Sequence, residues 1–347
     1  MSFQNVGTFD LGMIGGKTGK AGTGNAAKFA MNDAGIASGQ AFLTSELEKR
    51  DNLVRTPLTS FTYARDIPIR VGGGWAEFVS SMNVGYGLAG GSGDGLMHAG
   101  GSNGIPMVQA NFEKGVHKAH MIAAGTRIMW IDMQRENMTG RNLDTLLRDG
   151  LRMAYDKHMD ENTYVGFARY GTTGLLNNPD VVTTDAAATG ASSGTTFKSK
   201  TPNQILDDIN AAILEAWSAS ENDLDAVPNH ILMPYEQYNY LATIRVSELA
   251  EKTILTFLME NNVAKQNGSD LFIGASRWCK GAGEGQKDRM VVYCNKERYL
   301  AMDELVPLTR AMTGSNVENF CYDTAYAGNL SEVELFYEQT MIYVDGI

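Results

Sequence analysis

The residues with the clearest chemical signature are the glycine-rich run GMIGGKTGK at positions 12–20. Gly-Lys-Thr after further glycines is typical of a phosphate-binding loop, G-x-x-x-x-G-K-[ST], in which four intervening residues let backbone N–H groups surround the phosphates. Here only three residues separate Gly12 from Gly16, and the residue five places before Gly16 is Leu11. The spacing argues against a nucleotide site and favours a flexible arm rich in glycine and alanine.

A second chemical motif is the sequence GASSG at residues 190–194, which matches the nucleophile elbow G-x-S-x-G. That elbow needs a strand before its serine and a helix directly after it. Ser192 lies instead in TTDAAATGASSGTTFKSK, whose composition is typical of a solvated loop. We therefore expect no hydrolase site at Ser192.

His117 and His120 form an H-x-x-H pattern with Glu113 nearby, a combination that can bind a metal ion on a helix. On the strand expected here, an offset of three places the two histidines on opposite faces. We therefore expect exposed histidines at an interface rather than a metal site. No other feature indicates a metal ion or a cofactor.

Carboxylate pairs and cysteines give equally little support for catalysis. Neighbouring carboxylates on a helix do not face each other, so solvated helix faces are the expectation for these pairs. They are Glu46/Glu48, Asp160/Glu161 and Asp207/Asp208. The cysteines Cys279, Cys294 and Cys321 are too few and too scattered for a disulfide scaffold. Cys294 and Cys321 are expected in the core.

Composition restricts the class of protein further. The chain has 347 residues, enough for about two domains, and 40 acidic against 29 basic residues give a net charge of −11. This balance disfavours binding of nucleic acid over the whole surface, which requires lysine and arginine. No apolar run approaches the roughly 20 residues of a membrane span, and the start MSFQNVGTFDLG lacks a signal peptide's features. A reducing cytoplasm is the expected compartment.

The middle of the first half predicts one long β-hairpin. Two segments alternate in part between apolar and polar residues, GWAEFVSSMNVGYG and IPMVQANFEKGVHKAHMIAAGTRIMW. Between them, at about residues 88–104, lies a glycine-rich tip, and residues 85–104 contain nine of the 38 glycines. A two-stranded hairpin of this length is marginal alone in water, so a neighbouring subunit is expected to hold it.

The rest of the chain predicts a mixed α+β structure. Residues 140–167 carry a helical apolar stripe, with Asn142 as N-cap and Gly166 or Gly171 as the stop. A second helix is expected from Pro202, capped by Thr201. Further strands are predicted at PNHILMP, DLFIGA, DRMVVYC and EVELFYEQTMIYVDGI, and further helices at YEQYNYLATIRV and EKTILTFLMENN.

The order of these segments resembles that of tailed double-stranded-DNA phage major capsid proteins and the related encapsulins. The resemblance covers most of residues 60–347. It rests on the stretches GTTGLLNNPDV, PNHILMPYEQYNYLA, KTILTFLMENN, GAGEGQKDRMVVYCNKERYLAMDELVPL and YDTAYAGNLSEVELFYEQTMIYVDGI.

The resemblance implies the Hong Kong-97-type capsid fold, of class α+β. It places an N-terminal arm at 1–55 and an axial domain at 172–310. The peripheral domain comprises 56–171 and 311–347, including an extended loop at 67–120 and a spine helix at 140–167.

The resemblance also implies a non-enzymatic protein of the virion, assembled in the bacterial cytoplasm into an icosahedral shell of hexamers and pentamers. The implied partners are further copies of itself, a portal protein, a separate scaffolding protein, a cement protein and packaged double-stranded DNA. Contact with DNA would be weak, through an arm with three lysines against one aspartate in residues 1–31. An encapsulin-like compartment and a soluble enzyme with a mobile lid remain as alternatives.

Two expectations concern the extended loop. Some relatives form isopeptide bonds from a lysine on this loop, but residues 72–109 contain no lysine, and Lys114 lies near the base. We therefore expect no covalent cross-links. Large side chains without a local core are expected to contact a neighbouring subunit, unless some of them pack on their own helix. They are Trp75, Phe78, Tyr86, Met107 and Phe112.

Overall fold

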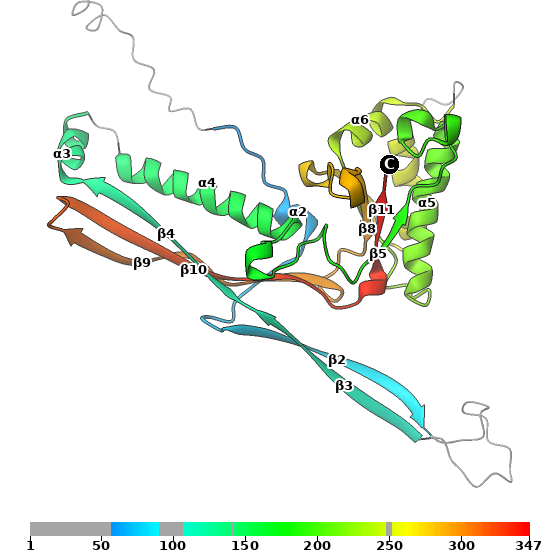
Figure 1. Ribbon diagram of the computed structural model, residues 1–347, viewed down its shortest axis with the longest axis horizontal. Helices are drawn as coiled ribbons and strands as arrows, with labels where there is room; N and C mark the ends of the chain where they lie inside the picture. Colours follow the sequence, from blue (N-terminus) through cyan, green and yellow to red (C-terminus); the bar gives the residue numbers. More distant parts are fainter. Residues whose placement is uncertain (1–56, 90–106, 140–141, 248–251) are drawn as a thin grey trace, which may run out of the picture. The chain divides into compact units, whose positions relative to one another are not determined.

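The structure is a computed structural model that describes residues 57–89, 107–139, 142–247 and 252–347 (Figure 1). The chain divides into two units, Met1–Thr59 and Ser60–Ile347, and the second contains all the elements discussed below. The glycine-rich run at 12–20, the pair Glu46/Glu48 and the hairpin tip lie outside the described residues. Among the described helices, none has the length and apolar character needed to span a bilayer.

The first sheet of this unit has four strands, and helix α4 packs against it. In spatial order the strands are β1 (Ile69–Val71), β9 (Leu300–Asn316), β10 (Cys321–Leu335) and β4 (His120–Met129). β1 is parallel to β9, whereas β10 is antiparallel to both of its neighbours. A short helix, α3 (Trp130–Thr139), follows β4.

Helix α4 (Leu143–Tyr164) follows the predicted apolar stripe and is delimited by the predicted cap. The side chain of Asn142 accepts a hydrogen bond of 2.9 Å from Thr145 N–H, which satisfies one of the free donors of the first turn. The helix ends before Gly166, whose φ of 69° is a conformation that glycine adopts without strain. In Figure 1, α4 runs beside β4 and β10.

The second sheet has five strands and contains most of the core. Their order is β5 (Val182–Asp185), β11 (Met341–Asp345), β8 (Arg289–Tyr293), β6 (His230–Met233) and β7 (Phe272–Ala275). Helix α5 (Pro202–Ala219) begins at the predicted Thr201 cap and buries Ile205, Ile209 and Ile213. The shorter helices α6 (Tyr235–Thr243) and α7 (Ile254–Glu260) contribute to the same core, and a further short helix, α8 (Val263–Gln266), follows them.

The predicted hairpin is formed by β2 (Phe78–Ala89) and β3 (Met107–Lys118), which belong to neither larger sheet (Figure 1). The two-stranded part is shorter than the range 67–120 proposed from sequence. β1 pairs with β9, and the chain after Ala119 continues as β4 beside β10. The expected single return strand is therefore two strands that serve different sheets.

The strand pairing also departs from the domain boundaries expected from the sequence. β9 is one continuous strand, so the boundary at 310/311 falls inside it. β11 pairs with β5 and β8, so the last strand lies in the five-stranded sheet and not beside β10. Neither difference could be inferred from local alternation, because strand partners are chosen by the tertiary packing.

Asp160 differs most clearly from expectation. It was assigned to a solvated helix face, yet it is only 1% exposed. Its carboxylate accepts hydrogen bonds from Thr62 N–H, Arg277 Nη2 and Trp278 Nε1 at 3.0, 2.8 and 2.7 Å. Asp160 therefore joins α4 to the segment before α2 (Tyr63–Asp66) and to the turn after β7.

Candidate assembly surfaces

One face of the β2–β3 hairpin is a continuous exposed apolar surface. In an antiparallel pair, directly opposed residues lie on the same face. The register pairs Ser80 with Val116, Val84 with Phe112, and Tyr86 with Ala110. The large apolar side chains on this face, all exposed, are Phe78, Met82, Val84, Tyr86, Val108, Phe112 and Val116. We call them the apolar face of the hairpin.

In its middle, the opposite face of the hairpin carries small and polar residues. It carries Ser81, Asn83 and Gly85 on β2, opposed to Gly115, Glu113 and Asn111 on β3. The contrast means that one face can exclude water against a partner while the other stays solvated. Lys114 and Lys118 stand on the apolar face, opposite Met82 and Phe78, and add positive charge to its base.

The residues expected from sequence to contact a neighbour divide between these surfaces. Phe78, Tyr86 and Phe112 share the apolar face, whereas Met107 opposes Ala89 on the other face. Trp75 precedes β2 and is exposed. Sequence reasoning missed four members of the face: Met82, Val84, Val108 and Val116. The signal that identifies them is the strand register, because every second residue from Phe78 and from Val108 points the same way.

An apolar face of this kind is unusual for a surface that remains in water. Phe112 and Met82 are each 70% exposed and Tyr86 is 77% exposed. Contiguous exposed apolar patches mark interaction sites, since full burial of one such side chain stabilises by about 1.5–3 kcal/mol. Within the described part of the chain, these side chains remain exposed.

The base of the hairpin is attached to β10 by a small polar network. Asn329 Nδ2 donates to the carbonyl of Ala76 at 2.8 Å. His117 Nδ1 lies 2.8 Å from Glu332 Oε1, and the other carboxylate oxygen of Glu332 accepts a 3.0 Å hydrogen bond from Thr173 N–H. His117 is therefore half-buried and paired, in contrast to the exposed histidine expected from sequence.

The electrostatics of this network favour a charged His117. The hydrogen bond to Glu332 raises the pKa of His117 above its usual value, although partial burial acts in the opposite sense. Burial alone would raise the pKa of Glu332, but the hydrogen bonds from His117 and Thr173 N–H lower it. Burial raises the pKa of the neighbouring Glu334. The result is an ion pair at the hairpin base beside a buried acidic group.

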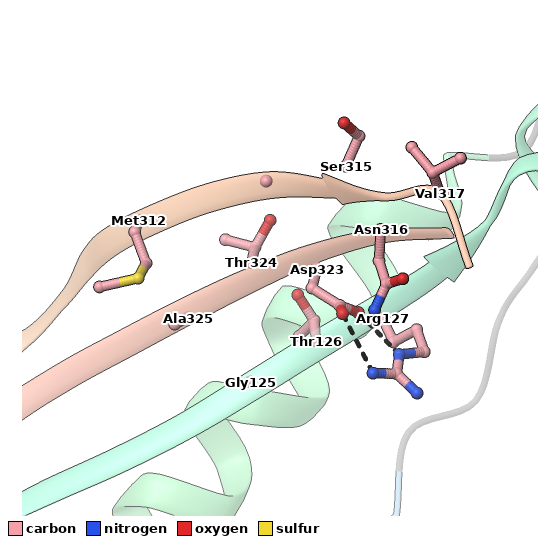
Figure 2. A pocket seen from close by; sticks show the side chains of 11 residues that line it. Gly125, Thr126, Arg127, Met312, Ser315, Asn316, Val317, Asp323, Thr324 and Ala325 are labelled. Carbon is pink, nitrogen blue, oxygen red and sulfur yellow. Dashed lines mark hydrogen bonds and ion pairs between the residues drawn. The ribbon is translucent and has the colours of Figure 1, made fainter. Parts of the chain in front are cut away.

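A second surface feature is a groove of about 720 Å³ on the four-stranded sheet. Figure 2 shows its floor of small residues, including Gly125 and Ala325, between Met312 at one end and Val317 at the other. Arg127 and Asp323 are directly opposed and joined by hydrogen bonds of 2.7 and 3.0 Å. The groove offers space for bulky side chains and carries little uncompensated charge.

The chemical motifs of the sequence are not assembled into a reaction site. Ser192 lies in a short 3-10 turn (Ala191–Ser193), with β5 ending at Asp185 and α5 beginning at Pro202. His117 and His120 lie in different strands, and His120 packs 5.4 Å from Tyr170, measured between ring centroids. Asp208 pairs with Lys200. Cys294 and Cys321 are buried as expected, and Cys279 is buried as well. Across the described residues, no cluster of three or more metal-binding side chains occurs.

The fold and these surfaces define a subunit built to associate with other subunits. A family model described as "Major capsid protein" matches residues 93–347, and the chain belongs to this family. The resemblance found from sequence is thereby confirmed. No curated protein sequence matches the chain significantly.

Solved capsid structures share the fold. The capsid protein of Myoviridae phage XM1 is similar with a TM-score of 0.71 and 17% identity, over 87% of this chain and 98% of that chain. A solved structure from Microbacterium phage Oxtober96 has a TM-score of 0.57 and 13% identity, over 88% of this chain and 97% of that chain. The capsid of an empty GTA particle gives 0.56 and 12%, over 91% and 99%. At these identities the likeness establishes the fold, and the mixed α+β prediction is confirmed.

Proposed function

We propose that this major capsid protein assembles with copies of itself into a closed icosahedral shell that encloses a phage genome, and that the hairpin is the main contact between neighbours. The observation that carries the proposal is the apolar face of the hairpin. Seven large apolar side chains on one side of a two-stranded ribbon are exposed in the single subunit. Burial against a neighbouring copy would remove them from water.

In this proposal the contact is heterologous, so that the apolar face of one copy meets a different surface of the next. Heterologous contacts form rings when the rotation closes, and rings of six and five are the units of an icosahedral shell. The groove near Met312 and Ala325 is one surface with room for the hairpin's bulky side chains. Many such contacts in a closed shell stabilise the assembly far more than any single pair.

Sedimentation and electron microscopy of the purified full-length chain test this function. We expect megadalton shells, either from the chain alone or when it is expressed with neighbouring genes. Shells only in the second case would support a separate scaffolding protein. A 37.7 kDa monomer under both conditions would contradict the assembly function.

The further partners are proposals of the same kind. A portal protein and a cement protein would bind the assembled shell and not the subunit, so their capture should depend on shell formation. Packaged DNA would meet the acidic chain only weakly, because a net charge of −11 leaves few cationic groups to neutralise phosphates. Co-sedimentation with DNA in low and physiological salt checks that expectation.

We also propose that the shell is held together without isopeptide bonds. The sequence has no lysine in residues 72–109, and Lys114 lies well inside β3, opposite Met82. A denaturing gel of purified shells, boiled with reductant, should therefore show one band at the subunit mass. A ladder of covalent multimers would contradict the prediction, and mass spectrometry of the ladder would identify the lysine involved.

A further inference from the structure

The hairpin is joined to the rest of its unit through a narrow base with a glycine pivot. Gly72, Gly73 and Gly74 have φ values of 129°, 114° and 69°, a region that residues with a side chain rarely adopt. A Cβ on Gly73 would stand 2.6 Å from Leu305 Cδ2. On the return path, Ala119 separates β3 from β4, and its N–H donates to the carbonyl of Glu77 at 2.9 Å.

Because the hairpin is long, a small rotation at the glycine pivot moves its far end a long way. Each strand has 12 residues, which at about 3.3 Å per residue gives a ribbon about 40 Å long. A rotation of about 10° at the base would move the far end by about 7 Å, more than the roughly 4.5 Å over which apolar side chains stay in contact. A small change at the base therefore decides which part of a neighbour the apolar face meets.

The side chains of two β10 residues, Asn329 and Glu332, hold the base of the hairpin against β10. One contact is the hydrogen bond from Asn329 to the Ala76 carbonyl, which does not titrate. The other is the pairing of His117 with Glu332, whose carboxylate is held in place by Thr173 N–H. The Glu332 carboxylate is thus held in position on β10. If the hairpin rotates, His117 moves with it and Glu332 does not.

We infer that the His117–Glu332 ion pair is a proton-dependent latch that sets the angle of the hairpin and thereby regulates its contact with the neighbouring subunit. The inference rests on the proposed assembly function. With His117 protonated, the charge-assisted hydrogen bond holds the hairpin against β10. Loss of the proton removes the ion-pair attraction and leaves a weaker hydrogen bond between the neutral imidazole and the carboxylate, and the glycine pivot then permits other angles.

The charged groups around His117 support this sense of the effect. Glu332 and Glu334 face His117 from β10, and both favour its protonated form. Arg70 on β1 lies 3.8 Å from Glu334 and forms hydrogen bonds of 2.6 and 2.8 Å with Asp303. His120 on β4 also faces Glu332. The stabilisation is complete below the unfolded pKa of about 6.5 and is lost as the pH rises through the higher pKa of the folded state.

Hydrogen–deuterium exchange of the full-length chain between pH 5.5 and 8.5, corrected for intrinsic rates, tests the latch. The amides to follow are those of Ala119 and Thr173. We expect their protection in the wild type to fall about fivefold as the pH rises, because the carboxylate binds a neutral imidazole less strongly than an imidazolium ion. His117→Gln and Glu332→Gln should show the low protection at every pH.

His120→Gln is the matched control, because it removes a second histidine near Glu332 but keeps the hydrogen bond between His117 and Glu332. It should keep the wild-type pH profile. A wild-type profile that is flat with pH, or a His117→Gln profile equal to that of the wild type, would overturn the latch. The pH dependence of protection in the wild type tests the latch even if both variants fail to fold. Electron microscopy of the same wild-type samples reports shell formation separately, so failure of the latch and failure of the assembly function are distinguishable.

Discussion

Replacement of Phe112 by aspartate is expected to abolish shell formation while the subunit remains folded. Phe112 lies at the centre of the apolar face, opposite Val84, and is 70% exposed in the single subunit. Loss of its buried contact costs about 2 kcal/mol for each neighbour, about thirtyfold in each association step, before the cost of burying a carboxylate is added. Because the same contact is repeated around a closed shell, the losses add up and prevent the shell from forming. Sedimentation velocity and electron microscopy would measure it.

The adjacent residue supplies the control. Asn111→Asp introduces the same charge one position away, but Asn111 opposes Gly85 on the small, polar face. This variant should assemble like the wild type. Circular dichroism should show the same folded signal for both variants, since neither position contributes to the core. Shells of normal yield from Phe112→Asp, or equal loss of assembly in both variants, would contradict the role of the apolar face.

Arg289→Met is expected to destabilise the subunit itself by about 3–5 kcal/mol, because it leaves a buried carboxylate without its cation. Arg289 begins β8 and Asp345 ends β11, and the two are directly opposed. Two hydrogen bonds of 2.7 and 2.8 Å join them, and Arg289 Nη1 also donates to the carbonyl of Leu176 at 2.6 Å. Denaturant unfolding of the unassembled subunit measures the change.

A neighbouring ion pair provides the comparison for Arg289. Lys287 and Asp185 are also 2.7 Å apart, but both side chains are largely exposed, so Lys287→Met should change the unfolding midpoint little.

The dependence of stability on acid pH gives a second test of the buried pair. Although burial opposes it, hydrogen bonding to Arg289 lowers the pKa of Asp345, so its contribution to stability is lost as the pH falls through that folded-state value. Equal effects of the two substitutions would contradict a special role for the buried pair.

Much of the secondary structure was predictable from local signals. Asn142 before an apolar stripe identified the start of α4, and Thr201-Pro202 identified the start of α5. Short apolar runs between turn residues identified β6, β7 and β8. These signals work because capping, helix periodicity and strand propensity depend on residues close together in the chain. The glycine-rich interruption likewise indicated a hairpin before any pairing was known.

The partners of the strands could not be predicted in this way. β9 and β10 form a long antiparallel pair with several register irregularities, and β9 contains Pro307 and many polar residues. β11 lies close to β10 in sequence but joins the other sheet, where Arg289 pairs with Asp345. Such choices depend on contacts between residues far apart in the chain, 56 positions in the case of Arg289 and Asp345, which no local pattern encodes.

The candidate site shows the same division. Residue types alone identified large apolar side chains without a local core, and the order of segments identified the capsid family. Only the register of β2 and β3 placed Phe112 with Phe78 and Tyr86 and put Met107 on the other face. Only the folded chain brought Glu332 to His117 and three donors to Asp160. Composition and spacing determine which elements form, because those interactions are local, whereas faces, partners and protonation depend on which distant residues the tertiary structure brings into contact.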